Sequence, residues 1–164
     1  MPIEAEPAGP GVAKHKKKKK KQDRRPSPDR TWANTGQLLG YGYRRFEDHT
    51  AELIRARGHG SYRVVHSSVL RNMDRAGTRT TELARRAGIT KQAMGQMVKE
   101  LVEFGYLEFA ADPGDKRAKL VVYTPMGNRL ATDALDAVTE VQDEFKKSLG
   151  KGGLKELRRL LEKL

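Results

Sequence analysis

The sequence predicts a mainly helical α+β fold, a winged helix-turn-helix with additional helices at both ends. Two observations support this prediction. Residues 78–105 hold two segments of helical periodicity on either side of a glycine-bearing turn, an arrangement typical of a helix-turn-helix. Two β-prone segments, residues 106–110 and 118–124, then flank a Pro-Gly pair, which predicts a β-hairpin directly after the helix pair.

The charge of the chain points to a polyanionic partner. Its 164 residues include 33 Lys and Arg but only 21 Asp and Glu, a formal net charge of +12. Such a balance favours nucleic acid or an acidic membrane surface. The absence of cysteine excludes disulfides and thiolate metal sites. No apolar run approaches the roughly 18 residues of a membrane span, so we expect a cytoplasmic protein with no membrane partner.

The N-terminal segment, residues 1–31, is expected to be a disordered basic tail. It holds 10 of the 33 basic residues, 4 of the 21 acidic residues and 5 prolines, and it has too few apolar side chains to form a core. Within it, Lys16–Lys21 form a block of like charge. Three roles are open for this block: solubilisation, a non-specific grip on nucleic acid phosphates, and membrane tethering.

Residues 32–164 are expected to form one folded domain, whose first helix spans about residues 34–57. The apolar stripe of this helix recurs at spacings of three and four residues and comprises Leu39, Tyr43, Phe46, Thr50 and Leu53. A second helix is expected to close at Gly77. Its inward residues should be Val65, Val69, Leu70 and Met73.

The helix pair is expected to consist of residues 81–87, ending at Gly88, and a longer helix that Thr90 caps. In the longer helix an apolar face comprises Met94, Met97, Val98, Leu101 and Phe104, and the opposite face carries Lys91, Gln92, Gln96, Lys99 and Glu103. Such a helix fits the major groove of DNA, where polar side chains reach base edges and phosphates. A plain helical hairpin with a solvated face is the alternative. Gly95 is either a tolerated weak position or a place where the backbone approaches DNA.

The hairpin is expected to be the wing of a winged helix-turn-helix over about residues 62–125. Arg117 is the expected minor-groove residue, because narrow minor grooves concentrate negative potential. Lys116 and Lys119 are placed to contact flanking phosphates. Asp115 would repel phosphate unless it pairs with Arg117 or accepts hydrogen bonds from amides of the turn.

The segments 80–108 and 112–127 resemble the winged helix-turn-helix of the MarR family of transcriptional regulators. The matching positions are Leu83-Ala84, Thr90, Leu101, Gly105-Tyr106, Asp112 to Arg117, and Thr124 to Gly127. One departure is that Phe109 and Ala110 follow Glu108, where the family often has a basic residue, so the resemblance implies no phosphate contact from that strand.

The resemblance implies a homodimer, most often a repressor, bound to a near-palindromic operator on double-stranded DNA. It also implies, for many members, a small aromatic effector that binds between the dimer helices and the winged lobe. Tyr43, Phe46 and His66 are the residues that would line such a cleft. Ordinary packing is the alternative for all three, and His66 in particular also fits a helix face or the core.

Two C-terminal helices, within residues 126–164, complete the predicted domain. The first runs to about Ser148 with Leu130, Leu135, Val138, Val141 and Phe145 apolar, and the second carries Leu154, Leu157, Leu160, Leu161 and Leu164. This is more leucine than a small winged module can cover. The resemblance implies that these helices intertwine with residues 34–57 of a second copy, whereas the alternative is that they fold back on their own domain.

An enzyme is not expected, and neither is a cofactor, a metal or a catalytic residue. The 4 histidines are scattered without the usual metal-ligand spacing, and the chain has no phosphate loop or nucleophile elbow. The sequence therefore predicts a dimeric, sequence-specific DNA-binding regulator associated with the nucleoid. Two competing hypotheses are a basic protein that coats nucleic acid without reading sequence and a protein-interaction module.

Overall fold

The computed structural model describes residues 34–150 and 152–164, so the expected basic tail lies outside the described residues. The elements in chain order are α1 (Thr35–Ala56), a 3₁₀ turn η1 (Val64–His66), α2 (Ser67–Leu70), α3 (Thr80–Ala87), α4 (Lys91–Glu103), β1 (Leu107–Asp112), β2 (Asp115–Tyr123), α5 (Pro125–Leu149) and α6 (Gly153–Leu161). A mainly helical fold with one antiparallel hairpin after a helix pair confirms the predicted winged-helix fold class.

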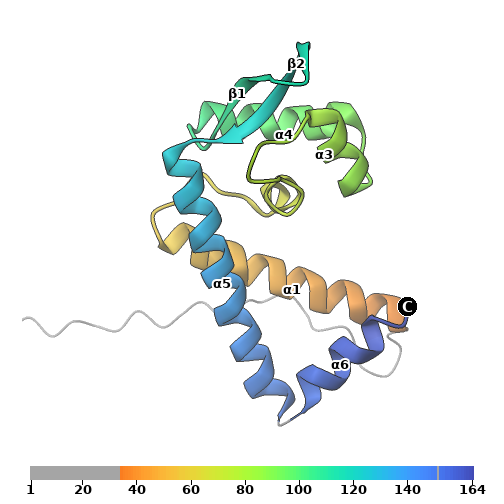
Figure 1. The fold of residues 1–164 in the computed structure, drawn as a ribbon. Helices are drawn as coiled ribbons and strands as arrows, with labels where there is room; N and C mark the ends of the chain where they lie inside the picture. Colours follow the sequence, from red (N-terminus) through yellow and green to blue (C-terminus); the bar gives the residue numbers. More distant parts are fainter. Residues whose placement is uncertain (1–33, 151) are drawn as a thin grey trace, which may run out of the picture.

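The elements form two parts that α5 connects (Figure 1). Helices α3 and α4 and the hairpin form a winged lobe at one end of the molecule, while α5 runs away from it and passes α1. Helix α6 then turns back toward the N-terminal end of α1. The predicted extents of the first helix and of both C-terminal helices agree with these bounds to within a few residues.

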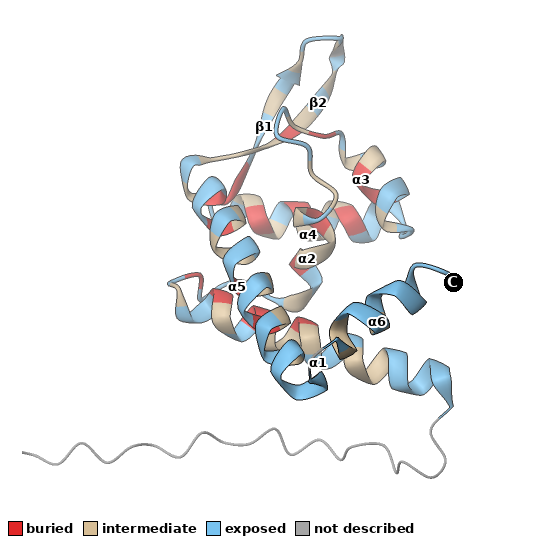
Figure 2. Cartoon of the chain, turned by 60° about the horizontal axis from the view of Figure 1, so that its bottom comes forward, coloured by how far each residue is buried: buried red, intermediate tan, exposed pale blue. Residues whose placement is uncertain are grey.

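Helix α1 begins with a capping box, in which Asn34 and Gln37 each accept a hydrogen bond from the other's backbone N–H. Its buried residues lie in the C-terminal half and are Glu47, Thr50, Ala51 and Ile54. Of the predicted stripe, Thr50 is buried in the single chain, whereas Leu39 and Tyr43 are 41% and 54% exposed. The reason is geometric, because the first three turns of α1 extend past the core of their own chain (Figure 2).

The second predicted helix is shorter than expected, and its inward face is different. It ends at Leu70 rather than near Gly77, and Val65 is exposed while His66 is fully buried. The cause is the 3₁₀ turn at its start, which has three residues per turn. In that geometry His66, three residues before Val69, takes the inward position in place of Val65.

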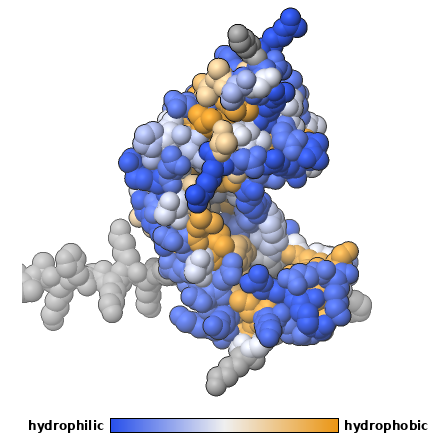
Figure 3. Space-filling view, in the orientation of Figure 1, coloured by the Kyte–Doolittle hydropathy of each residue, from blue (hydrophilic) through white to orange (hydrophobic). Residues whose placement is uncertain are grey.

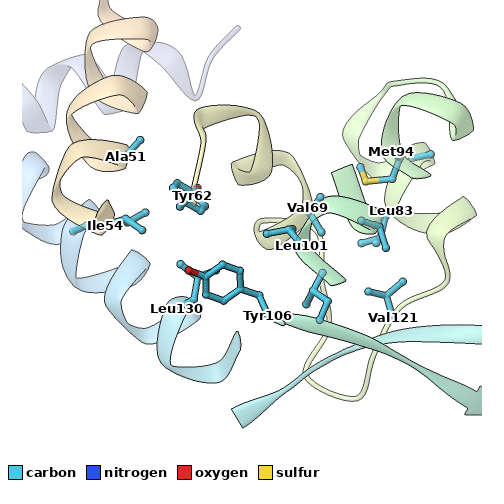
Figure 4. Packing of buried hydrophobic residues seen from close by; sticks show 14 residues of the cluster. Ala51, Ile54, Tyr62, Val69, Leu83, Met94, Leu101, Tyr106, Val121 and Leu130 are labelled. Atoms are coloured by element: carbon cyan, nitrogen blue, oxygen red, sulfur yellow. The ribbon is translucent and has the colours of Figure 1, made fainter. Parts of the chain in front are cut away.

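One hydrophobic core joins the winged lobe to the helices below it. Val121 on β2 packs in the same cluster as Leu83 on α3 and Leu101 on α4. Figure 4 shows Tyr106 between this part of the cluster and Leu130 on α5. Because these buried side chains form one continuous cluster, the orientation of the hairpin is linked to the packing of the helices.

The junction between the winged lobe and α5 requires a glycine. Thr124 Oγ1 donates to the carbonyl of Gly105 over 2.6 Å and accepts from the N–H of Gly127 over 3.0 Å, which caps α5. A Cβ atom at Gly127 would lie 1.9 Å from the carbonyl oxygen of Tyr106. The Thr-x-x-Gly pattern read from the sequence thus marks a place where a helix start lies directly against the backbone of the chain before β1.

We predict that Gly127→Ala destabilises the protein by about 1–3 kcal/mol or more, as overpacking against a rigid backbone does. The matched control is Gly95→Ala in α4, where an added Cβ would meet nothing within 4 Å and should stabilise the helix by up to about 1 kcal/mol. Urea unfolding at neutral pH measures both. Equal stabilities for Gly127→Ala and wild type would contradict the close approach at Tyr106.

Candidate nucleic-acid interface

Helix α4 presents its polar face to solvent as predicted. Thr90 accepts a hydrogen bond from the N–H of Ala93 over 3.2 Å and thereby caps the helix. Gly88, in the left-handed conformation with φ 66°, ends α3 and makes the turn between the two helices. The apolar face buries Met94, Val98 and Leu101, so α4 is fixed to the core by one side. The residues exposed on its other side are Lys91, Gln92, Gln96, Lys99 and Glu103.

Gly95 lies on α4 with no neighbour that requires it to be glycine. Its φ is not positive, and a Cβ atom there would meet no atom within 4 Å. Glycine costs a helix interior about 1 kcal/mol relative to alanine. The packing of the described residues therefore gives no reason for this glycine, which leaves open the hypothesis that the backbone approaches a ligand here.

The turn of the wing is organised by two aspartates. Asp112 Oδ1 accepts from the N–H of Gly114 over 2.8 Å, and Asp115 Oδ1 accepts from the N–H of Arg117 over 3.0 Å. Of the two alternatives for Asp115, the structure therefore shows amide acceptance rather than an ion pair with Arg117. Arg117 and Lys119 are exposed on β2, and the side chain of Lys116 lies outside the described part of the structure.

A third segment that holds the wing was not predicted from any sequence pattern. The N–H and carbonyl of Thr78 pair with those of Val121 in two hydrogen bonds of 3.0 Å. Gly77 comes before this bridge with φ 96°, and a Cβ on it would lie 2.6 Å from Val122 Cγ1. Arg79 follows the bridge and contacts Asp112, with Nε 2.6 Å from Oδ2. Since Arg79 and Asp112 are 33 positions apart, no local pattern could have paired them.

A buried histidine links α4 to the chain before α2. The Nδ1 atom of His66 accepts from the N–H of Arg63 over 3.2 Å, so Nε2 carries the proton and donates to Glu100 over 3.0 Å. Burial lowers the pKa of His66, which favours this neutral ring. The hydrogen bond from His66, together with the contact from Arg63, lowers the pKa of Glu100 to about 2.

We predict that the stability of the protein falls with acid partly through Glu100. A carboxyl with a pKa of about 2 in place of the ordinary 4.5 stabilises the fold above pH 4.5, and this contribution is lost as the pH falls toward 2. Glu100→Gln should therefore show a smaller decline in unfolding free energy over that range. Urea unfolding at a series of pH values measures it, with Glu108→Gln on the exposed side of β1 as control. If the unfolding free energy of Glu100→Gln fell with pH as steeply as that of the wild type, the lowered pKa of Glu100 would be contradicted.

A cavity of about 660 Å³ lies between α1, the α2 region and α5. Its lining is largely apolar and includes Phe46, Ile54, Tyr62, Leu70, Met73, Tyr123, Ala131, Ala134, Leu135 and Val138. Figure 3 shows hydrophobic residues gathered in the hollow between the winged lobe and the helices below it. The polar lining includes Glu47, Arg71, Arg75, Asn128, Thr132 and Gln142.

Of the three residues expected at an effector cleft, only Phe46 lines this cavity. Tyr43 does not line the cavity but contacts one of its lining residues, Arg71, whose guanidinium donates to the Tyr43 hydroxyl over 3.0 Å. Arg71 also pairs with Glu47, a second lining residue, over 2.7 Å. His66 faces Glu100 instead. His66 is fully buried in the core, in agreement with the alternative position given for it above, whereas the exposure of Val65 was not expected.

Two further observations concern the described residues alone. No group of three or more His, Cys, Asp or Glu side chains among them is arranged to hold a metal ion. None of their helices combines the length and apolar character that a membrane crossing requires.

Comparison with known proteins identifies the winged segment. Residues 61–118 match the family model of the MarR family, whereas comparison with curated protein sequences gives no match. This segment is therefore similar to the MarR family, which confirms the predicted resemblance. The match covers the helix pair, β1 and the wing turn.

The fold is similar to solved structures of regulators. A probable transcriptional regulator from Pseudomonas aeruginosa is 24% identical, with 82% of this chain and 98% of that chain covered and a TM-score of 0.67. CouR from Rhodococcus jostii, bound to p-coumaroyl-CoA, is 25% identical over 77% of this chain and 88% of that chain, with a TM-score of 0.63. A MarR family protein from Mycobacterium tuberculosis in complex with salicylic acid is 25% identical over 80% and 96%, with a TM-score of 0.61.

Proposed function

We propose that this protein is a non-catalytic transcriptional regulator of the cytoplasm and nucleoid that binds double-stranded DNA at specific sequences as a homodimer. The observation that carries the proposal is that one winged lobe presents both the exposed polar face of α4 and a hairpin with the exposed cations Arg117 and Lys119. The match of residues 61–118 to the MarR family model and the similarity to solved regulators support it.

We propose that the exposed face of α4 recognises the base sequence of the DNA. Lys91, Gln92, Gln96 and Lys99 are exposed and have the length and polarity to reach base edges in the major groove. The N-terminal part of the helix, from Thr90, would enter the groove first, as recognition helices do. Because Gly95 presents no side chain on this helix, the backbone could approach the DNA closely at that point.

The wing is proposed to place Arg117 in the neighbouring minor groove, with Lys116 and Lys119 on the phosphates. Asp115 supports this arrangement because its carboxylate accepts a hydrogen bond from the N–H of Arg117. The negative charge of Asp115 is thereby directed at the backbone of the turn. An exposed guanidinium in that position would find the high negative potential of a narrow minor groove.

We predict that Arg117→Ala weakens binding to the preferred site by about 1–3 kcal/mol, the cost of a lost specific contact. The control is Lys147→Ala, which removes the same charge from the exposed far end of α5. Fluorescence anisotropy with site-bearing and scrambled DNA at fixed salt measures both variants. Unchanged affinity in Arg117→Ala would show that Arg117 does not contact the DNA. Equal affinity of the wild type for both DNAs would favour the hypothesis of a basic protein that coats nucleic acid without reading sequence.

The dimer is proposed from the apolar surface that the single chain leaves exposed. Helix α6 buries none of its residues, and Leu160 and Leu161 are 48% and 42% exposed. Leu38 and Leu39 at the start of α1 are similarly exposed, and Figure 1 shows α6 turned toward that end of α1. A two-fold dimer through these helices would place two α4 helices about one DNA turn, roughly 34 Å, apart on a near-palindromic site.

We predict that removal of residues 151–164 converts the dimer into a weakly associating protein. Sedimentation equilibrium measures the change, and circular dichroism confirms that the truncated chain keeps its helices. Lys155→Ser, which changes an exposed polar residue of α6, is the control and should leave association intact. A tight dimer without α6 would show that this helix is not the contact.

A small aromatic effector is proposed for the cavity between α1 and α5. The two similar structures with p-coumaroyl-CoA and with salicylic acid show that regulators of this fold bind aromatic acids and their derivatives. Phe46 and Tyr62 supply aromatic lining, and Arg75 supplies a cation. A ligand there would act on DNA binding by favouring one of two spacings of the α4 helices in the dimer.

The basic tail, residues 1–31, is proposed to add salt-dependent, sequence-independent affinity. The tail carries a net positive charge, and neutralising phosphates with lysine releases counterions. Whether the protein represses or activates transcription depends on the position of its site, and we propose repression as the family's usual mode.

A further inference from the structure

Arg79, the residue immediately before α3, contacts both aspartates of the wing turn. Its Nε and Nη2 atoms lie 2.6 Å and 2.5 Å from Asp112 Oδ2, and Nη2 lies 3.6 Å from Asp115 Oδ2. The side chain of Asp112 is 11% exposed and that of Arg79 is 44% exposed, so the carboxylate is sheltered while the guanidinium is partly open to solvent. Among the described residues, no other arginine has an ion pair with either aspartate of the turn.

The two aspartates also hold the backbone of the turn with their other oxygen atoms. Asp112 Oδ1 accepts from Gly114 N–H, and Asp115 Oδ1 accepts from Arg117 N–H. The hydrogen bond from Gly114 and the contact with Arg79 both lower the pKa of Asp112, which keeps it ionised at neutral pH. A continuous set of polar contacts therefore runs from the start of α3 through Asp115 to the backbone of Arg117.

The base of the hairpin is held separately. The Thr78–Val121 bridge is opposite Phe109 of β1, and Asp112 lies three residues further along β1, after a register shift that pairs it with Asp115. The turn therefore extends roughly 10 Å beyond the bridge. A two-stranded ribbon of that length is only marginally stable on its own. Without a contact near its tip, the outer half of the hairpin would move relative to α4. Arg79 supplies that contact, one residue after the bridge.

We propose that Arg79 is a positioning residue that fixes the wing tip, and with it Arg117, relative to the recognition helix α4. This inference rests on the proposed DNA-binding function. Arg79 acts through the two aspartates and not by its own contact with DNA. It also offsets two negative charges that would otherwise lie beside the phosphate backbone.

The first test measures the wing in the free protein. Because the chain has no cysteine, Pro113→Cys introduces a single attachment point for a spin label at the exposed turn. Arg79→Ala should increase the mobility of the label. Arg85→Ala, which removes an arginine that pairs with Glu82 of its own helix α3, should leave the spectrum as in the parent. Equal label mobility in Arg79→Ala and parent would overturn the proposal.

The second test is a double-mutant cycle on the preferred DNA site. Arg79→Ala alone should weaken binding about tenfold, within the range for a lost specific contact. In an Arg117→Ala background the same change should cost less than about twofold, because coupled residues are not additive. Arg79→Lys keeps the charge but lacks the fork that spans both carboxylates, so it should not restore affinity. Arg85→Ala should add fully to Arg117→Ala.

The outcomes distinguish a failure of the positioning role of Arg79 from a failure of the proposed DNA-binding function. Full additivity of Arg79→Ala with Arg117→Ala, or rescue by Arg79→Lys, would show that Arg79 contacts phosphate directly and would overturn the positioning role. A wild-type protein without any site preference would refute the proposed function instead. In that case the label mobility still decides whether Arg79 holds the wing.

Discussion

The bridge between Thr78 and Val121 is the interaction on which the rest of the structure depends. Its two backbone hydrogen bonds join the chain before α3 to the C-terminal part of β2, at the base of the hairpin, and the Val121 side chain is fully buried among residues of the helix pair. An isolated hairpin would have no fixed direction. Since the same short segment leads into α3, the helix pair and the wing become one body with a defined geometry.

A second constraint connects that body to the helices that lie below it. Gly127 begins α5 against the carbonyl of Tyr106, and Thr124 caps the same helix while it holds Gly105. Along α5, His59 pairs with Asp133 over 2.7 Å and Arg57 with Glu140 over 2.8 Å. The cavity lies in this region, between α1 and α5. A ligand that alters the α1–α5 packing would therefore change the direction in which α5 carries the winged lobe.

Local patterns were sufficient to predict the features that depend on local physics. Gly88 and Thr90 mark a helix end and a helix start because backbone conformation and capping involve neighbouring residues. The burial of Met94, Val98 and Leu101 follows from helical spacing.

Features that depend on distant contacts could not be predicted in the same way. Helical spacing assigned Val65 to the core, whereas a 3₁₀ turn puts His66 there beside Glu100. Leu39 and Tyr43 lie on the expected stripe, but they remain 41% and 54% exposed in the single chain. Arg79 and Asp112 meet only because the bridge at Thr78 brings their segments together.

The central claim is that the wing tip meets DNA at one fixed place beside α4. The most direct measurement attaches a DNA-cleaving reagent to the single cysteine of Pro113→Cys and maps the cuts on a fragment that carries the preferred site. A wing tip held at one place in a two-fold dimer should give two short clusters of minor-groove cuts, placed symmetrically about the centre of the site. Even cleavage along the whole fragment would contradict it.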